Sequence, residues 1–184
     1  MRLRVGFPVA LAILVYAAAS FGAEPNPAAS KLLLEGDRAA LARDFDGAVA
    51  KYRAVLAEDP RNAFAHYRIG QAESIKGDFT EAEQAYFAAL RFSGTNDVLR
   101  AKVLFCIADL RERQHAFEAA VDAWTEYEKQ GVTAPKSTPH AATAAERKNR
   151  IAEWKKALAT AAEVKARIAR RIQEVEDLAR KNAR

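Results

Sequence analysis

The chain has 184 residues, and half of them are hydrophobic. This length allows one domain with an appendage. Many of the hydrophobic residues are alanine, a composition that suits close-packed helices better than a sheet. The formal net charge is +5, and the single cysteine, Cys106, excludes an internal disulfide. Because its neighbours are mostly apolar, we expect Cys106 to be a small core residue and not a reactive thiol.

Residues 1–23 have the pattern of an export signal. Two arginines among the first four residues precede an apolar run of about 15 residues, Val5 to Ala19, the length of a signal-peptide core. Small residues allow cleavage after Ala19 or near Ala23. The alternative is an uncleaved N-terminal anchor, since the apolar stretch approaches the roughly 20 residues that cross a membrane. In either case we expect the rest of the chain to be exported to a periplasm or cell envelope.

A repeat with a period of about 34 residues follows a Pro-containing linker at 24–28. Five positions of the first copy recur at this one spacing with the same residue. These pairs are Gly36 and Gly70, Phe45 and Phe79, Ala48 and Ala82, Tyr52 and Tyr86, and Leu56 and Leu90. A looser third copy, displaced by a slightly longer interval, contains Ala108, Phe117, Ala120, Trp124 and Tyr127. We therefore expect an internal repeat, with about one extra helical turn or loop near Asn96–Arg100.

Each copy has the apolar spacing of two amphipathic helices joined by a short turn. The predicted helices are 29–42, 45–58, 62–76, 79–92, 97–114 and 117–130. Their turns are short enough to force antiparallel hairpins. Gly70 and Ala82 are expected where two helices approach closely, beside the large Phe79 and Tyr86. One such hairpin cannot bury its apolar side alone, so the hairpins are expected to stack.

This pattern resembles the tetratricopeptide repeat family over residues 29–131, divided into 29–62, 63–96 and 97–131. The residues that carry the resemblance are Ile69-Gly70 and Glu35-Gly36 at the family's Leu-Gly pair, and Ala48, Tyr52 and Pro60 of the second-helix signature. Ala39 and Glu73 replace the aromatic residue of the first helix, and the third copy lacks the glycine and the proline. The resemblance implies an all-α solenoid of about three helical hairpins, with a concave groove lined by the first helix of each.

Partners of such proteins usually bind in the concave groove, so the resemblance implies a set of groove residues by register. This set is Asp37, Phe64, Tyr67, Gln71, Ser74, Lys102, Phe105, Asp109 and Glu112, with Leu33 and Ala40 beside them. Aromatic, acidic and amide side chains together suit an extended or helical peptide. The alternative is that Tyr67 and Phe105 pack within the stack.

The chaperone-binding subclass of the family holds a terminal carboxylate with Lys, Asn and Arg side chains in the groove. At the corresponding places this sequence has Leu33, Asp37, Leu34 or Arg68, Lys102 and Cys106. Only Lys102 fits, so that specificity is not expected.

A break at Gly131 to Pro139 predicts a linker at 132–140. Residues 141–184 contain no glycine or proline and predict one long helix with a heptad-like apolar stripe. The stripe is Ile151, Trp154, Leu158, Ala161, Ile168, Ile172 and Val175. We expect the first half to cap the last repeat through Trp154 and Leu158, and the second half to project or to self-associate as a weak coiled coil. The alternative is a fourth, degenerate hairpin bent near 159–162.

Positive charge is concentrated in this last helix. Residues 141–184 contain 12 Lys or Arg and 6 acidic residues. A basic helix can bind nucleic acid, an anionic lipid surface or an acidic partner. Export argues against nucleic acid, which leaves an ordinary solvated face or, as the functional alternative, an anionic membrane or envelope surface.

Catalytic and metal-binding motifs are absent from the sequence. His66, His115 and His140 lie too far apart for a short metal-ligand motif, and there is no Gly-rich phosphate loop or nucleophile elbow. We therefore expect no enzyme, no cofactor and no metal, but a non-catalytic adaptor or scaffold that binds a protein or peptide partner in its groove. The alternative is a self-associating structural protein or an anionic-surface binder that acts through residues 141–184.

Overall fold

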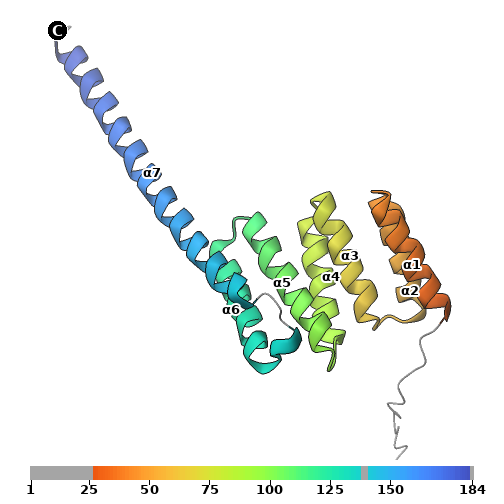
Figure 1. Cartoon of the computed structure of the whole chain (residues 1–184). Helices are drawn as coiled ribbons and strands as arrows, with labels where there is room; N and C mark the ends of the chain where they lie inside the picture. Colours follow the sequence, from red (N-terminus) through yellow and green to blue (C-terminus); the bar gives the residue numbers. More distant parts are fainter. Residues whose placement is uncertain (1–26, 138–140, 183–184) are drawn as a thin grey trace, which may run out of the picture.

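The computed structural model describes residues 27–137 and 141–182, and the regular structure in these ranges is helical. The elements are α1 (Pro27–Leu41), α2 (Phe45–Glu58), α3 (Ala63–Lys76), α4 (Phe79–Phe92), α5 (Asp97–Arg113), α6 (Phe117–Thr133), the 3-10 helix η1 (Pro135–Ser137) and α7 (Ala141–Asn182). Three hairpins, α1–α2, α3–α4 and α5–α6, stack in a row, and α7 leaves the last one as a long rod (Figure 1). The expected all-α hairpin solenoid with a long C-terminal helix is confirmed. The predicted signal at 1–23 and part of the linker at 132–140 lie outside the described residues.

The helices follow their predicted ranges closely, apart from the end of α6. Helix α6 continues through Gly131 to Thr133, so this glycine does not end it. The additional residues of the third copy lengthen α5, which has 17 residues where α3 has 14. Helix α7 is a single element from Ala141 to Asn182, and the alternative of a hairpin bent near 159–162 is wrong.

The repeated glycines are explained by the tyrosine of the facing helix. A Cβ atom added to Gly70 would lie only 2.5 Å from Cδ1 of Tyr86, and one added to Gly36 would meet the ring of Tyr52 as closely. Tyr52 and Tyr86 are 1% and 3% exposed. Because packed interiors have no room for such an atom, the two helices of the first hairpin and those of the second approach this closely only with glycine at that position.

Each hairpin turns through one residue in the left-handed backbone conformation. These residues are Arg43 with φ 63°, Gly77 with φ 92° and His115 with φ 57°. Glycine adopts this conformation freely, whereas a side chain there costs about 1–2 kcal/mol. Asp44 follows the first of these residues, and its Oδ1 caps α2 by accepting a 2.9 Å hydrogen bond from the amide of Gly47.

The apolar core is continuous from α3 to α7 and smaller at the first hairpin. One cluster joins Tyr86, Trp124 and Ile151 with their neighbours on α3 to α7. The first hairpin joins the stack through two smaller clusters, which contain Tyr52 and Val55.

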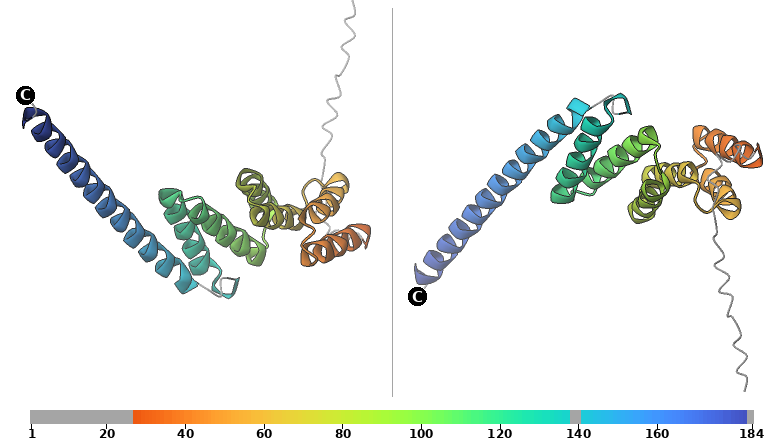
Figure 2. Two further views of the ribbon diagram at one scale, coloured as in Figure 1. Left: turned by 90° about the horizontal axis from the view of Figure 1, so that it is seen from above. Right: turned by 90° about the horizontal axis from the view of Figure 1, so that it is seen from below.

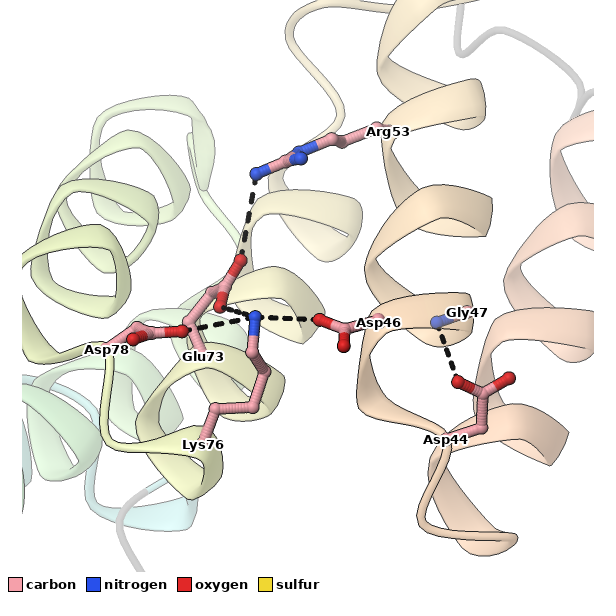
Figure 3. A network of polar contacts seen from close by, with 7 residues as sticks. All are labelled: Asp44, Asp46, Gly47, Arg53, Glu73, Lys76 and Asp78. Carbon is pink, nitrogen blue, oxygen red and sulfur yellow. Dashed lines mark hydrogen bonds and ion pairs between the residues drawn. The ribbon is translucent and has the colours of Figure 1, made fainter.

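An ion-pair network also fastens the first hairpin to the second (Figure 3). Nζ of Lys76 on α3 lies 2.8 Å from Glu73, 2.9 Å from Asp46 of α2 and 3.1 Å from Asp78. Arg53 of α2 approaches the other oxygen of Glu73 at 3.6 Å, and the side chain of Glu73 is only 4% exposed. Hydrogen bonds to Glu73, Asp46 and Asp78 raise the pKa of Lys76 above its usual range. The charge of Lys76 therefore compensates a carboxylate that the stack has buried.

The first turns of α7 pack on the third hairpin as a cap. Ile151 is 1% exposed, and Arg147 hydrogen-bonds to Glu112 at 2.9 Å and to Asp109 at 3.1 Å, both on α5. Trp124 of α6 donates its indole N–H to the same oxygen of Glu112. From residue 152 to residue 182 every position is exposed, so burial ends at Ile151, the first residue of the predicted stripe, and Trp154 and Leu158, which were expected to form the cap, are 42% and 58% exposed. Within 27–137 and 141–182, no helix combines the length and the apolar character that crossing a membrane requires.

Candidate binding groove

A groove of about 320 Å³ lies where the first two hairpins meet. Its lining residues are Asp37, Ala40 and Leu41 of α1, Phe45 and Tyr52 of α2, and Arg68, Gln71, Ala72 and Ile75 of α3. Leu41 is 85% exposed and Ile75 is 57% exposed. The groove is therefore an open trough with apolar edges and a polar floor.

A chain of hydrogen bonds fixes that floor. Arg68 donates to Oδ2 of Asp37 at 3.1 Å and to Oε1 of Gln71 at 3.0 Å. Tyr52 donates its hydroxyl to Oδ1 of Asp37 at 2.7 Å, and Nε2 of Gln71 donates to the hydroxyl of Tyr67 at 2.9 Å. These bonds hold the side chains of the floor in place, so the floor is pre-formed, although Nε of Arg68 is buried without a hydrogen-bond partner among the described residues.

The floor carries opposite charges that are paired with each other. The guanidinium of Arg68 lies 5.3 Å from the ring centre of Phe64 and 5.9 Å from that of Tyr67, in addition to its ion pair with Asp37. Burial, with smaller effects from Cys106, raises the pKa of Tyr67 to about 12. Burial and the hydrogen bond to Asp37 also raise the pKa of Tyr52. Both phenols are therefore neutral near pH 7, and the floor presents no net charge.

Four of the predicted groove residues come together around this trough. Asp37 and Gln71 line it directly. Phe64 does not line the trough but lies against Arg68; it is 39% exposed and meets Tyr67 edge-on at 6.0 Å. Tyr67 is only 7% exposed and belongs to the core, which is the alternative considered for it above.

The other predicted groove residues lie farther along the stack, and most of them hold elements together. Ser74 is 7% exposed and accepts a 2.8 Å hydrogen bond from Arg113. Phe105 packs edge-on against Trp124, with ring centres 5.1 Å apart. Asp109 and Glu112 bind Arg147 of the cap, while Lys102 is exposed on α5. A binding role for any of the nine residues stays a prediction.

Sequence reasoning did not include Arg68 among the groove residues, although it joins the two sides of the trough. Arg68 occupies the place in the second copy that Leu34 has in the first, so a charged residue replaces an apolar one there. That change of type was a usable signal. The apolar edges at Leu41 and Ile75 had no such signal, because exposed apolar residues at helix ends are common.

Metal binding is not suggested by the side-chain arrangement. In the part of the chain that the structure describes, no three His, Cys, Asp or Glu side chains are placed to hold a metal ion.

Comparisons with known proteins place the fold. No family model and no curated protein sequence matches the chain. Among solved structures, it is similar to the TPR2B domain in the pHsp70 complex of yeast Sti1, with a TM-score of 0.62 at 14% identity over 70% of this chain and 99% of that one. It is also similar to a T3SS complex from Aeromonas hydrophila, with a TM-score of 0.61 at 17% identity over 70% of this chain and 83% of that one. The TPR domain of Arabidopsis OM64 gives a TM-score of 0.56 at 18% identity over 67% of this chain and 93% of that one. The tetratricopeptide-type fold expected from the repeat is confirmed.

Proposed function

We propose that this chain is a non-catalytic adaptor that binds a segment of a protein partner in the trough between α1 and α3. The observation that carries the proposal is the combination of exposed apolar edges, Leu41 and Ile75, with a pre-formed polar floor. Small binding sites of this kind take up apolar groups and orient them with a few polar ones. The similar yeast domain is bound to pHsp70 in its structure, which supports a protein or peptide segment as the ligand of this trough.

The charges of the floor favour an internal peptide segment over a peptide that is recognised by its terminal carboxylate. Asp37 places a carboxylate in the trough, and Arg68 is already engaged by Asp37 and Gln71. The carboxylate of Asp37 would repel a terminal carboxylate, which would also have to displace Asp37 and Gln71 from Arg68. An internal segment with one or two apolar side chains fits better, because those side chains fill the volume while its backbone meets the neutral floor.

The proposed location is the periplasm or cell envelope, and it depends on the signal-like residues 1–23. Cell fractionation and N-terminal sequencing of the purified protein test this part. Cleavage after Ala19 or near Ala23 supports export with removal of the signal. A protein in the cytosol with an intact N-terminus contradicts it.

Capture from an envelope extract tests the trough. The chain from Glu24 is compared with a groove variant, Leu41→Glu with Ile75→Glu, and with a control that introduces the same residues outside the trough, Ala50→Glu with Ala57→Glu. All four side chains are exposed, so the helices should fold in each variant. We expect the control to retain a partner that the groove variant loses.

A shortened chain that ends at Ala159 separates the groove from the last helix. It keeps every buried residue of α7 and should still bind the partner. Equal capture by the groove variant, or capture that disappears only in the shortened chain, contradicts the proposal and places recognition in α7.

A further inference from the structure

The second half of α7 is a helix without a packing partner in the described chain. Residues 156–182 extend for about 40 Å at the helical rise of 1.5 Å per residue, clear of the hairpins in every view (Figures 1 and 2). We call these residues the arm. Its large apolar side chains are between 46% and 66% exposed: Leu158, Val164, Ile168, Ile172, Val175 and Leu178.

An apolar hollow lies where the arm leaves the cap. This base groove has a volume of about 420 Å³ and is lined by His115, Phe117, Trp154, Ala157, Leu158 and Ala161. Trp154 is 42% exposed, and its ring centre lies 6.2 Å from that of Phe117. The stripe of the arm runs directly into this hollow, since Leu158 belongs to both.

We propose that the arms of two copies of this chain pair as an antiparallel coiled coil, with the last turns of each arm seated in the base groove of the other copy.

The heptad spacing of the stripe is the first argument for a helical occupant. Ile151, Leu158, Lys165 and Ile172 follow one another at intervals of seven residues, the repeat of a helix seam. Ile151, the first of them, is already buried between α7 and the third hairpin. The seam therefore begins as a helix–helix interface within the chain, and a second helix would continue it.

A membrane surface suits the arm less well. The arm as a whole is positively charged, but Glu174, Glu176 and Asp177 lie together within one turn beside the exposed Val175 and Leu178, and anionic lipid would repel them there. Lys165 also stands in the middle of the apolar stripe, where an interfacial helix has its most deeply inserted residues.

The direction of pairing follows from what occupies the two ends of the seam. At its beginning, the third hairpin already covers Ile151, so a parallel second helix would meet that hairpin. A parallel pair in register would also bring the two copies of Lys165 face to face. An antiparallel pair avoids both, because each arm then lies against the free half of the other.

One antiparallel register brings the seam residues of the two copies together in successive layers. It places Leu158 opposite Val175 of the second copy, Ala161 opposite Ile172, and Lys165 opposite Ile168. The stem of Lys165 covers that isoleucine while its ammonium group reaches water.

The same register fills the base groove. Leu178 of the second copy comes beside Ala157, at the edge of the hollow formed by Phe117 and Trp154. Glu176 of the second copy comes near Lys155, which gives opposite charges on the rim of the seam.

Sedimentation equilibrium of the chain from Glu24 tests the pairing over about 1 µM to 1 mM, the range of a moderate association. We expect a monomer–dimer equilibrium. The seam variant Ile168→Glu with Ile172→Glu should weaken it at least about tenfold, a loss of about 1.4 kcal/mol. Its control, Ala166→Glu with Gln173→Glu, introduces the same residues on the opposite face and should leave it unchanged.

A monomeric chain at the highest concentration overturns the proposal, and so does an equal loss in the seam variant and the control. Co-sedimentation with vesicles of phosphatidylglycerol and phosphatidylcholine tests whether the arm binds an anionic membrane surface instead. Binding of a monomeric chain to these vesicles that the seam variant loses would assign the arm to lipid and not to a second copy.

Disulfide trapping tests the direction in a Cys106→Ala background. Chains carrying Leu158→Cys and chains carrying Val175→Cys should cross-link when mixed and oxidised, because these positions face each other. Leu158→Cys alone should not cross-link, since its two copies lie about 25 Å apart along the coil, far beyond the roughly 7 Å that a disulfide spans between Cα atoms. A cross-linked Leu158→Cys dimer shows parallel pairing and refutes the arrangement. The arm and the trough share no residue, so either proposal can fail without the other.

Discussion

Replacement of Arg147 by methionine tests how the last helix is held to the repeats. The guanidinium of Arg147 hydrogen-bonds to Glu112, whose side chain is 3% exposed, and to Asp109, whose side chain is 39% exposed. Breaking a buried ion pair by removing one partner costs about 3–5 kcal/mol. The exposed pair with Asp109 adds about 1 kcal/mol at most. Arg147 is itself 27% exposed, and water that enters its place will solvate Glu112 in part. We therefore expect a loss of about 2–4 kcal/mol in the free energy of unfolding.

Two further variants make this measurement specific. Lys155→Met removes the exposed pair with Glu118, in which the side chains are 48% and 78% exposed, and should cost less than about 1 kcal/mol. Adding Glu112→Gln to Arg147→Met removes the uncompensated charge and leaves an acceptor for Trp124, so it should recover about half of the loss or more.

Urea unfolding, followed by circular dichroism and by tryptophan fluorescence, gives these free energies where the two signals coincide. The reasoning is refuted if Arg147→Met costs no more than Lys155→Met, or if Glu112→Gln makes the Arg147 variant less stable. Either result would mean that the carboxylate of Glu112 does not depend on Arg147 for compensation.

Three other substitutions and a pH titration test the hairpins. Gly70→Ala places a Cβ atom against the ring of Tyr86 and should cost about 1–3 kcal/mol in urea unfolding; an unchanged stability contradicts the close contact. Arg43→Gly and His115→Gly relieve a left-handed backbone and should each stabilise the fold by up to about 1 kcal/mol, so a lower melting temperature in both variants counts against that strain. Tyr67 has its pKa raised from 10.0 to about 12, so the unfolded chain loses this proton first and the free energy of unfolding should fall as the pH rises from 10 to about 12. A flat profile over that interval in urea titrations disagrees with the burial of its hydroxyl.

The hairpins could be predicted because their tightest contact involves two residues at a constant separation. Gly36 with Tyr52 and Gly70 with Tyr86 have the same spacing, and each pair touches in the structure. Ala108 and Trp124 keep that spacing in the third copy, and both are fully buried. A period in the sequence reports such contacts well, since both partners lie in one repeat.

Contacts between repeats left much weaker traces in the sequence. Glu73 looked like a departure from the family pattern, but it is the buried partner of Arg53 in the preceding repeat. Asp109 and Glu112 were assigned to the groove by register, whereas the structure turns them toward the cap. The distances along the chain between these partners follow from how the helices pack, and no fixed spacing reveals them in advance.

The division of the core has a consequence for the motions of the chain. The trough lies between α1 and α3, beside the small apolar clusters that join the first hairpin to the second, while the large cluster lies in the rest of the stack. In stacked repeats, the unit with the smallest share of the core opens most often. Backbone amides of α1 and α2 should exchange with deuterium sooner than those of α5 and α6. A segment bound in the trough would contact both the first and the second hairpin. Its binding should therefore slow the deuterium exchange of α1 and α2, and this can be measured even before the segment is identified.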